Sequence, residues 1–157
     1  MAARTASPFW SLTTVNTSSS CARILPAPDQ LTLAFWTGGE HGRLLIQRCG
    51  SCQHCQHPPS ARCPQCGANQ LVPVTMSGLG TVATYTVNHQ AWRPGLSVPY
   101  SVAIVELDEQ PGLRLTTNIV GCDPQAVYIG QRVRVQFEQQ EDVWIPLFTP
   151  EKGASRP

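Results

Sequence analysis

The sequence has neither an excess of charge of one sign nor a long apolar run. Eleven Lys and Arg face ten Asp and Glu in 157 residues, so the chain has no long-range field that would gather nucleic acid. No stretch of about eighteen apolar residues could cross a membrane, and the first twenty residues lack the apolar block of a secretory signal. These absences favour a cytoplasmic protein without a membrane segment.

The familiar catalytic motifs are missing as well. The chain contains no GxSxG, HExxH, GxxxxGK or GxGxxG pattern. His89 and Cys122 could form a catalytic pair only by coincidence of folding, because no motif orients them. We therefore expect no activity from this chain acting alone.

Cysteine is concentrated in one place. Five of the seven cysteines lie in QRCGSCQHCQHPPSARCPQCG, residues 47–67, of a chain whose 41% apolar and 13% charged residues are typical of a globular protein. CxxC pairs in a reducing compartment bind metal more often than they form disulfides, so the cluster predicts a zinc site. Cys21 and Cys122 lie outside it, and we interpret them as an exposed thiol and a small packing residue.

Zinc takes four thiolates in a tetrahedron, and the cluster offers five. Cys63 and Cys66 form one CxxC turn followed by a glycine, whereas the other turn is either Cys49 with Cys52 or Cys52 with Cys55. Spacing favours the first choice and leaves the second open, because pairing Cys52 with Cys55 would leave only seven residues before the next ligand. Four thiolates close the coordination shell in either case, so we expect a structural zinc rather than a catalytic one.

Two further side chains in the cluster, His54 and His57, exceed what the metal needs. With the favoured set of ligands, Cys55 is also in excess. We expect these three to lie beside the ligands rather than on the metal.

The order of motifs predicts several regions. Residues 1–24 are expected to be a flexible leader, followed by a short helix that Asp29 caps and Gly38–Gly39 ends. This helix carries Leu31, Ala34 and Phe35 at helical spacing. Strands at 43–47 and 71–76 flank the cysteines, which predicts a helix plus zinc ribbon over residues 25–76.

Beyond the ribbon the apolar period changes to two. Ala83, Tyr85 and Val87 share a predicted face, and further strands are expected at 100–107, 113–120, 132–138 and 142–148. Five short strands with no covering helix favour a five-stranded Greek-key barrel of the OB type over residues 77–149, with an open sandwich second. Residues 150–157 are expected to be a tail.

One loop of the barrel, QAWRPGLSVPY at residues 90–100, offers a candidate ligand surface. The indole of Trp92 could stack on a purine, and the guanidinium of Arg93 could hold a phosphate. A stiff loop whose tryptophan caps the barrel is the competing interpretation.

Read in order, a series of short motifs over residues 25–149 resembles one family, that of rubredoxin-like zinc ribbon plus OB-fold proteins that accompany acyl-CoA enzymes. The motifs are PAPDQLTLAFWTGGEHGRLLIQRCGSC, PPSARCPQCG, SGLGTVATYTVNH, PYSVAIVELDE, TTNIVGCDP and IGQRVRVQF. The resemblance implies a mainly β fold in which an N-terminal helix and a rubredoxin-like ribbon precede the OB-fold barrel. It also implies that the zinc ligands are Cys49, Cys52, Cys63 and Cys66.

The chain departs from this family at one turn. Gln53 stands where the residue after the second cysteine is usually glycine, and Cys55 is an additional cysteine.

The resemblance further implies a non-catalytic subunit. Such proteins form complexes with thiolases, including the sterol-carrier-protein type, or with hotdog-fold enoyl-CoA hydratases, in lipid, polyketide or steroid metabolism. The barrel is expected to approach acyl-CoA, with Trp92 and Arg93 as candidate contacts. The alternative is a module that binds single-stranded nucleic acid, which the near-neutral charge and few aromatics disfavour.

Overall fold

The computed structural model describes residues 23–151 of the chain. Most of the predicted leader and most of the predicted tail therefore lie outside the described residues. Within residues 23–151, no helix is long and apolar enough to cross a membrane.

The first element is the predicted short helix, α1 (Leu33–Thr37), which continues into the 3-10 turn η1 (Gly38–His41). The carboxylate of Asp29 accepts hydrogen bonds from the backbone N–H groups of Leu31 and Thr32, at 3.1 and 2.8 Å, as a capping residue does. The helix buries Phe35, whereas Leu31 remains 45% exposed. One apolar side chain, rather than a full stripe, anchors the helix.

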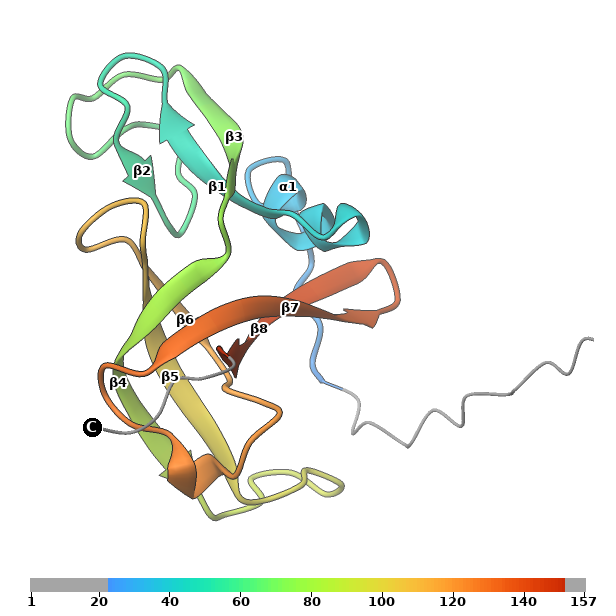
Figure 1. Cartoon of the computed structure of the whole chain (residues 1–157). Coiled ribbons are helices and arrows are strands. Elements are labelled where there is room, and N and C mark those ends of the chain that lie inside the picture. The colour runs from blue at the N-terminus through green and yellow to red at the C-terminus, as the bar shows by residue number, and fades with distance from the viewer. Residues whose placement is uncertain (1–22, 152–157) are drawn as a thin grey trace, which may run out of the picture.

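The ribbon is a three-stranded antiparallel sheet in the order β2-β1-β3. Its strands are β1 (Leu44–Cys49), β2 (Cys55–Gln56) and β3 (Leu71–Met76). The predicted strands at 43–47 and 71–76 correspond to β1 and β3, while β2 has only two residues and therefore no periodic signal. In Figure 1 the ribbon lies at one end of the molecule, with α1 beside β1.

The second sheet has five antiparallel strands in the order β6-β5-β4-β7-β8. They are β4 (Leu79–Asn88), β5 (Tyr100–Leu107), β6 (Arg114–Thr117), β7 (Arg132–Gln140) and β8 (Val143–Pro150), with a 3-10 turn η2 (Pro124–Ala126) between β6 and β7. A parallel bridge between Ile119 and Phe148 joins the two edges. There the N–H of Val120 donates to the Phe148 carbonyl at 2.8 Å, so the sheet forms a nearly closed barrel, as predicted.

The barrel core differs from the predicted pattern in β4. The pairing of β4 with β5 shifts between Val82 and Thr84, and this irregularity places Val82 in the fully buried core. Ala83, Tyr85 and Val87 are only half-buried. A strict period of two could not foresee Val82 because the irregularity resets the alternation.

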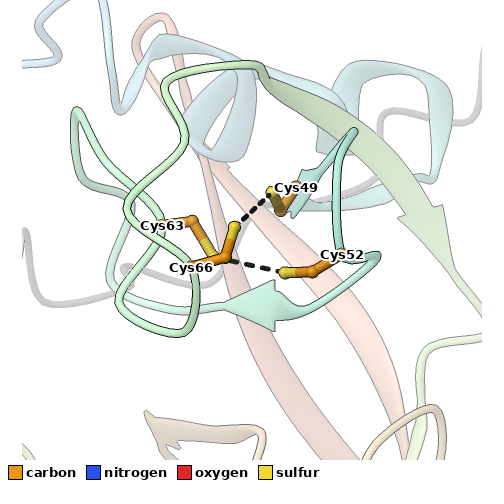
Figure 2. Close-up of side chains that lie close together, drawn as sticks. All are labelled: Cys49, Cys52, Cys63 and Cys66. Atoms are coloured by element: carbon orange, nitrogen blue, oxygen red, sulfur yellow. Dashed lines mark hydrogen bonds between the residues drawn. The ribbon is translucent and has the colours of Figure 1, made fainter.

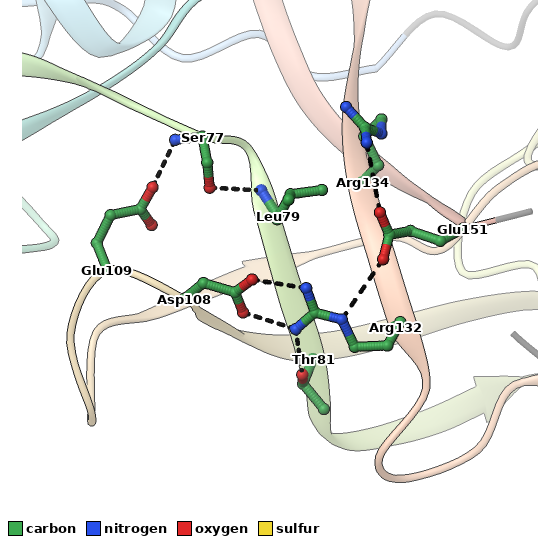
Figure 3. Close-up of polar contacts among 8 residues, drawn as sticks. All are labelled: Ser77, Leu79, Thr81, Asp108, Glu109, Arg132, Arg134 and Glu151. Atoms are coloured by element: carbon green, nitrogen blue, oxygen red, sulfur yellow. Dashed lines mark hydrogen bonds and ion pairs between the residues drawn. The ribbon is translucent and has the colours of Figure 1, made fainter.

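The turn after β5 fastens the ribbon to the barrel. The side-chain amide of Gln110 accepts a hydrogen bond from the Cys55 N–H at 2.8 Å and donates one to the Cys55 carbonyl at 3.0 Å. Its neighbour Glu109 accepts from the N–H of Ser77, the residue after β3. Three consecutive residues of the turn thus hold structure outside it, because Asp108 also pairs bidentately with Arg132, as Figure 3 shows.

Candidate metal centre and ligand-binding cavity

The two CxxC turns of the ribbon have the same backbone geometry. The N–H of Gln53 donates to the Cys49 carbonyl at 2.9 Å, and the N–H of Gly67 donates to the Cys63 carbonyl at 2.9 Å. Each first cysteine also closes the turn with its own N–H, Cys49 on the His54 carbonyl at 2.9 Å and Cys63 on the Ala68 carbonyl at 2.8 Å. Residues 49–54 and 63–68 are therefore two copies of one turn.

These turns bring four sulfur atoms together. The Sγ atoms of Cys49, Cys52, Cys63 and Cys66 all lie within 4.8 Å of one another, and Figure 2 shows the side chains pointing toward a common centre. Cys49 and Cys66 are 3.6 Å apart, as are Cys52 and Cys63. A disulfide would need about 2 Å, whereas sulfurs about 2.3 Å from a tetrahedral zinc are about 3.8 Å from each other. The donor set fits zinc.

The turns also prepare the sulfurs for metal. The backbone N–H of Cys52 points at the sulfur of Cys49 and lowers the pKa of that thiol to about 6. Zinc binds the thiolate form, so a thiol that ionises easily suits it. Four sulfurs complete the tetrahedron and leave no position for water, which is the arrangement of a structural site.

Cys55 lies outside this cluster. It is buried in β2, where burial raises the pKa of its thiol and keeps it neutral. His57 packs on Phe35 with ring centroids 4.6 Å apart, and burial lowers its pKa to about 4. Both residues pack the ribbon against its surroundings, and neither is among the four clustered groups.

The two candidate ligand contacts lie on the loop between β4 and β5 but face different surroundings. Trp92 is 69% exposed, and its Nε1 donates to Asn88 Oδ1 at 3.2 Å. That exposure does not fit a side chain that caps the barrel. Arg93 is half-buried and lines a cavity of about 760 Å³.

This cavity was not foreseen from the sequence. Its walls come from residues before α1, from α1, from the β4–β5 loop, from the segment after β6 and from β7 and β8. Segments so far apart carry no shared motif, and only the hydrophobic side chains of each could have hinted at it.

Cys122 lines the same cavity, which exposed His89 does not. Burial and the neighbouring Asp123 raise the pKa of the Cys122 thiol. A nucleophilic cysteine needs the opposite shift, so the structure does not bring this Cys–His pair together for catalysis.

Two family descriptions match consecutive parts of the chain. "ChsH2, rubredoxin-like zinc ribbon domain" covers residues 36–72, and "ChsH2, C-terminal OB-fold domain" covers residues 73–138. Together they span the cysteine turns and most of the barrel.

Two curated relatives have different lengths. A "probable enoyl-CoA hydratase alpha subunit" of Thermomonospora curvata is 40% identical over 119 residues, which are 74% of this chain but only 37% of that relative. A "DUF35 domain-containing scaffold protein" of Methanocaldococcus jannaschii is 35% identical over 114 residues, 71% of this chain and 79% of the relative. The chain thus spans well under half of the hydratase subunit and most of the scaffold protein.

A solved structure titled "Ltp2-ChsH2(DUF35) aldolase" contains a similar chain. The two share 36% sequence identity and superpose with a TM-score of 0.73 over 80% of this chain and 98% of the other.

Proposed function

This chain belongs to the ChsH2 (DUF35) family of zinc-ribbon and OB-fold proteins, and on that premise we propose that it is a zinc-containing accessory subunit of an acyl-CoA enzyme. It docks on a thiolase-like enzyme, including the sterol-carrier-protein type, or on a hotdog-fold enoyl-CoA hydratase. There it binds or positions acyl-CoA, and the partner supplies the reacting groups.

The observation that carries this proposal is the match to one chain of an aldolase. This chain covers 98% of that chain with a TM-score of 0.73, so the whole fold corresponds to one component of a two-part enzyme name. The other relatives are called a scaffold protein and a hydratase alpha subunit, both names that suit a component of an assembly.

The metal supports a scaffolding role. Cys49, Cys52, Cys63 and Cys66 would hold zinc with a closed set of four thiolates, which supplies folding free energy to the ribbon rather than a site for substrate. The pairing of ribbon and barrel through Gln110 would then give the partner a rigid surface to dock on.

The proposed contacts with CoA are Trp92 and Arg93. An exposed indole is available to stack on adenine, and the adjacent guanidinium can pair with phosphate oxygens. CoA offers both groups.

Co-purification tests this function. A tagged copy of the chain is expressed with candidate thiolase-like and hydratase partners, and we expect one of them to form a stable complex whose acyl-CoA turnover requires the chain. Arg93→Ala should lower that turnover without unfolding the protein. Arg134→Ala is the matched control, because Arg134 is exposed and its ion pair with Glu151 at 3.4 Å contributes little. Turnover by the isolated chain, or unchanged kinetics for Arg93→Ala, would contradict the proposal.

The nucleic-acid alternative receives little support from the barrel surface. Arg132 pairs with Asp108 at 2.6 Å, and both Arg132 and Arg134 reach Glu151 at 3.4 Å, so neither presents an unopposed positive charge. Submicromolar, salt-sensitive binding of a single-stranded oligonucleotide would nevertheless favour this alternative. A cytoplasmic location remains a prediction.

A further inference from the structure

The cavity of about 760 Å³ beside Arg93 has the size of a small-molecule site, since such sites measure about 300–1,000 Å³. It lies where the β4–β5 loop, the segment after β6 and the chain before α1 come together. One wall is Ile119, which is buried at the bridge that closes the barrel.

Most of the lining is apolar. The side chains that make it so come from five separate segments: Ile24, Trp36, Leu96, Ile119, Val120 and Ile145. Ile24 is 79% exposed, so a large apolar side chain stands in water beside the cavity. A ligand with a bulky apolar body would cover this surface and release the water in contact with it.

The charged groups of the lining favour an anionic end on that ligand. Arg23 Nε pairs with Glu138 at 3.1 Å, and its Nη1 donates to Asn118 Oδ1 at 2.9 Å. Arg93 is the second guanidinium of the lining, so two positive groups face one carboxylate there. The lining therefore combines an apolar body with one positive charge in excess.

We propose that this cavity receives the apolar acyl group of an acyl thioester, while Arg93 lies at the junction between the acyl group and the CoA portion outside. The proposal rests on the proposed function in taking acyl-CoA as the ligand. It adds that the chain reads the acyl group itself, in addition to the CoA portion common to all such thioesters. The subunit would thereby contribute to the choice of substrate.

A chain-length series tests the proposal. The zinc-loaded full chain is titrated calorimetrically with CoA and with octanoyl-, decanoyl- and dodecanoyl-CoA below their micelle concentrations. Burial of each methylene is expected to lower the dissociation constant about fourfold. Equal affinity for CoA and for all three thioesters would overturn the proposal and leave the proposed function standing.

Free dodecanoate separates the two ideas. If dodecanoate binds more tightly than octanoate while CoA alone does not bind, the acyl cavity stands and the proposed recognition of CoA fails. If none of these ligands binds, both fail.

Two variants fill the cavity. Cys122→Phe and Leu96→Trp replace lining residues with larger ones and should abolish the dependence on chain length. Ile129→Phe is the control, because Ile129 is 65% exposed and lies outside the lining. Circular dichroism checks that each variant folds, and Leu96→Trp, on a loop, serves if Cys122→Phe does not. A dependence on chain length that survives in a folded filling variant would overturn the proposal.

Trp36 reports the position of the chain directly. It lines the cavity, whereas Trp92 does not, so 12-bromododecanoate should quench the fluorescence of Trp36. The quenching should disappear in Trp36→Phe and persist in Trp92→Phe, and the reverse result would place the acyl group elsewhere.

Discussion

Gln53 and Gly67 occupy the same place in the two CxxC turns and share a left-handed backbone, with φ of 63° and 76°. Each follows the second cysteine of its turn and donates its N–H to the carbonyl of the first. The turn requires this conformation at that residue, and glycine adopts it without strain. Gln53 is thus a glutamine in a position that suits glycine, which explains why the resembled family usually has glycine there.

We expect Gln53→Gly to stabilise the ribbon. A left-handed residue with a side chain costs about 1–2 kcal/mol, and the extra freedom of glycine in the unfolded chain offsets about 0.5–1 kcal/mol of that. The net gain in unfolding free energy is up to about 1 kcal/mol, measurable by denaturant titration at buffered zinc.

The reciprocal substitution, Gly67→Ala, should destabilise the ribbon by about 1–2 kcal/mol. No atom lies within 4 Å of a Cβ added there, so the loss would come from backbone strain alone. Unchanged stability in both variants would contradict this account of the turns.

Removal of zinc should unfold the ribbon and leave the barrel. Binding of structural zinc contributes on the order of 10 kcal/mol to folding, and a three-stranded sheet with one two-residue strand has few other sources of stability. After chelation we expect protease cleavage within residues 43–76 and a change in the fluorescence of Trp36, which packs against the core. Full protease resistance of the ribbon without metal would contradict the prediction.

Much of the fold followed from local patterns in the sequence. The strands β3 and β5 begin and end where period and composition place them, because Pro, Gly and turn residues bound each apolar run. The short helix also followed from Asp29 and the glycine pair.

Other features depend on contacts between distant residues. Val82 enters the core through a shift in pairing, and β2 exists because Gln110 and β1 hold its two residues on either side. No local pattern encodes such contacts. Among the candidate site residues, the cysteines were recognisable by spacing, whereas the cavity beside Arg93 forms only when five segments converge.

Gln110→Ala should loosen the ribbon from the barrel. The substitution removes both hydrogen bonds to the backbone of Cys55, a residue only 7% exposed, and leaves its N–H and carbonyl without those partners. An unsatisfied buried group costs about 1–3 kcal/mol, so we expect a loss on the order of 2 kcal/mol. Amide hydrogen exchange at Cys55 should become faster.

Gln136→Ala provides the matched control for this test. Gln136 is exposed on β7, and its truncation should change stability by less than about 0.5 kcal/mol. Equal exchange rates at Cys55 in the two variants would show that Gln110 does not fasten the ribbon.

His57 should make the protein less stable as the pH falls below neutrality. Burial against Phe35 lowers its pKa from 6.5 to about 4 in the folded state, so between these values the unfolded chain binds more protons. The contribution is complete above pH 6.5 and decreases as the pH falls toward 4, with a loss of about 2 kcal/mol at pH 5.

The comparison with His57→Phe isolates this contribution, because the variant keeps an aromatic ring beside Phe35 but cannot take a proton. Protonation of the cysteines affects both proteins alike, so it cancels from the difference in unfolding free energy. We expect that difference to change by about 2 kcal/mol between pH 7 and pH 5 in favour of the variant. His89→Gln, at an exposed position, should show no such change. If the difference for His57→Phe is constant over this range, His57 is as accessible to protons in the folded protein as in the unfolded chain.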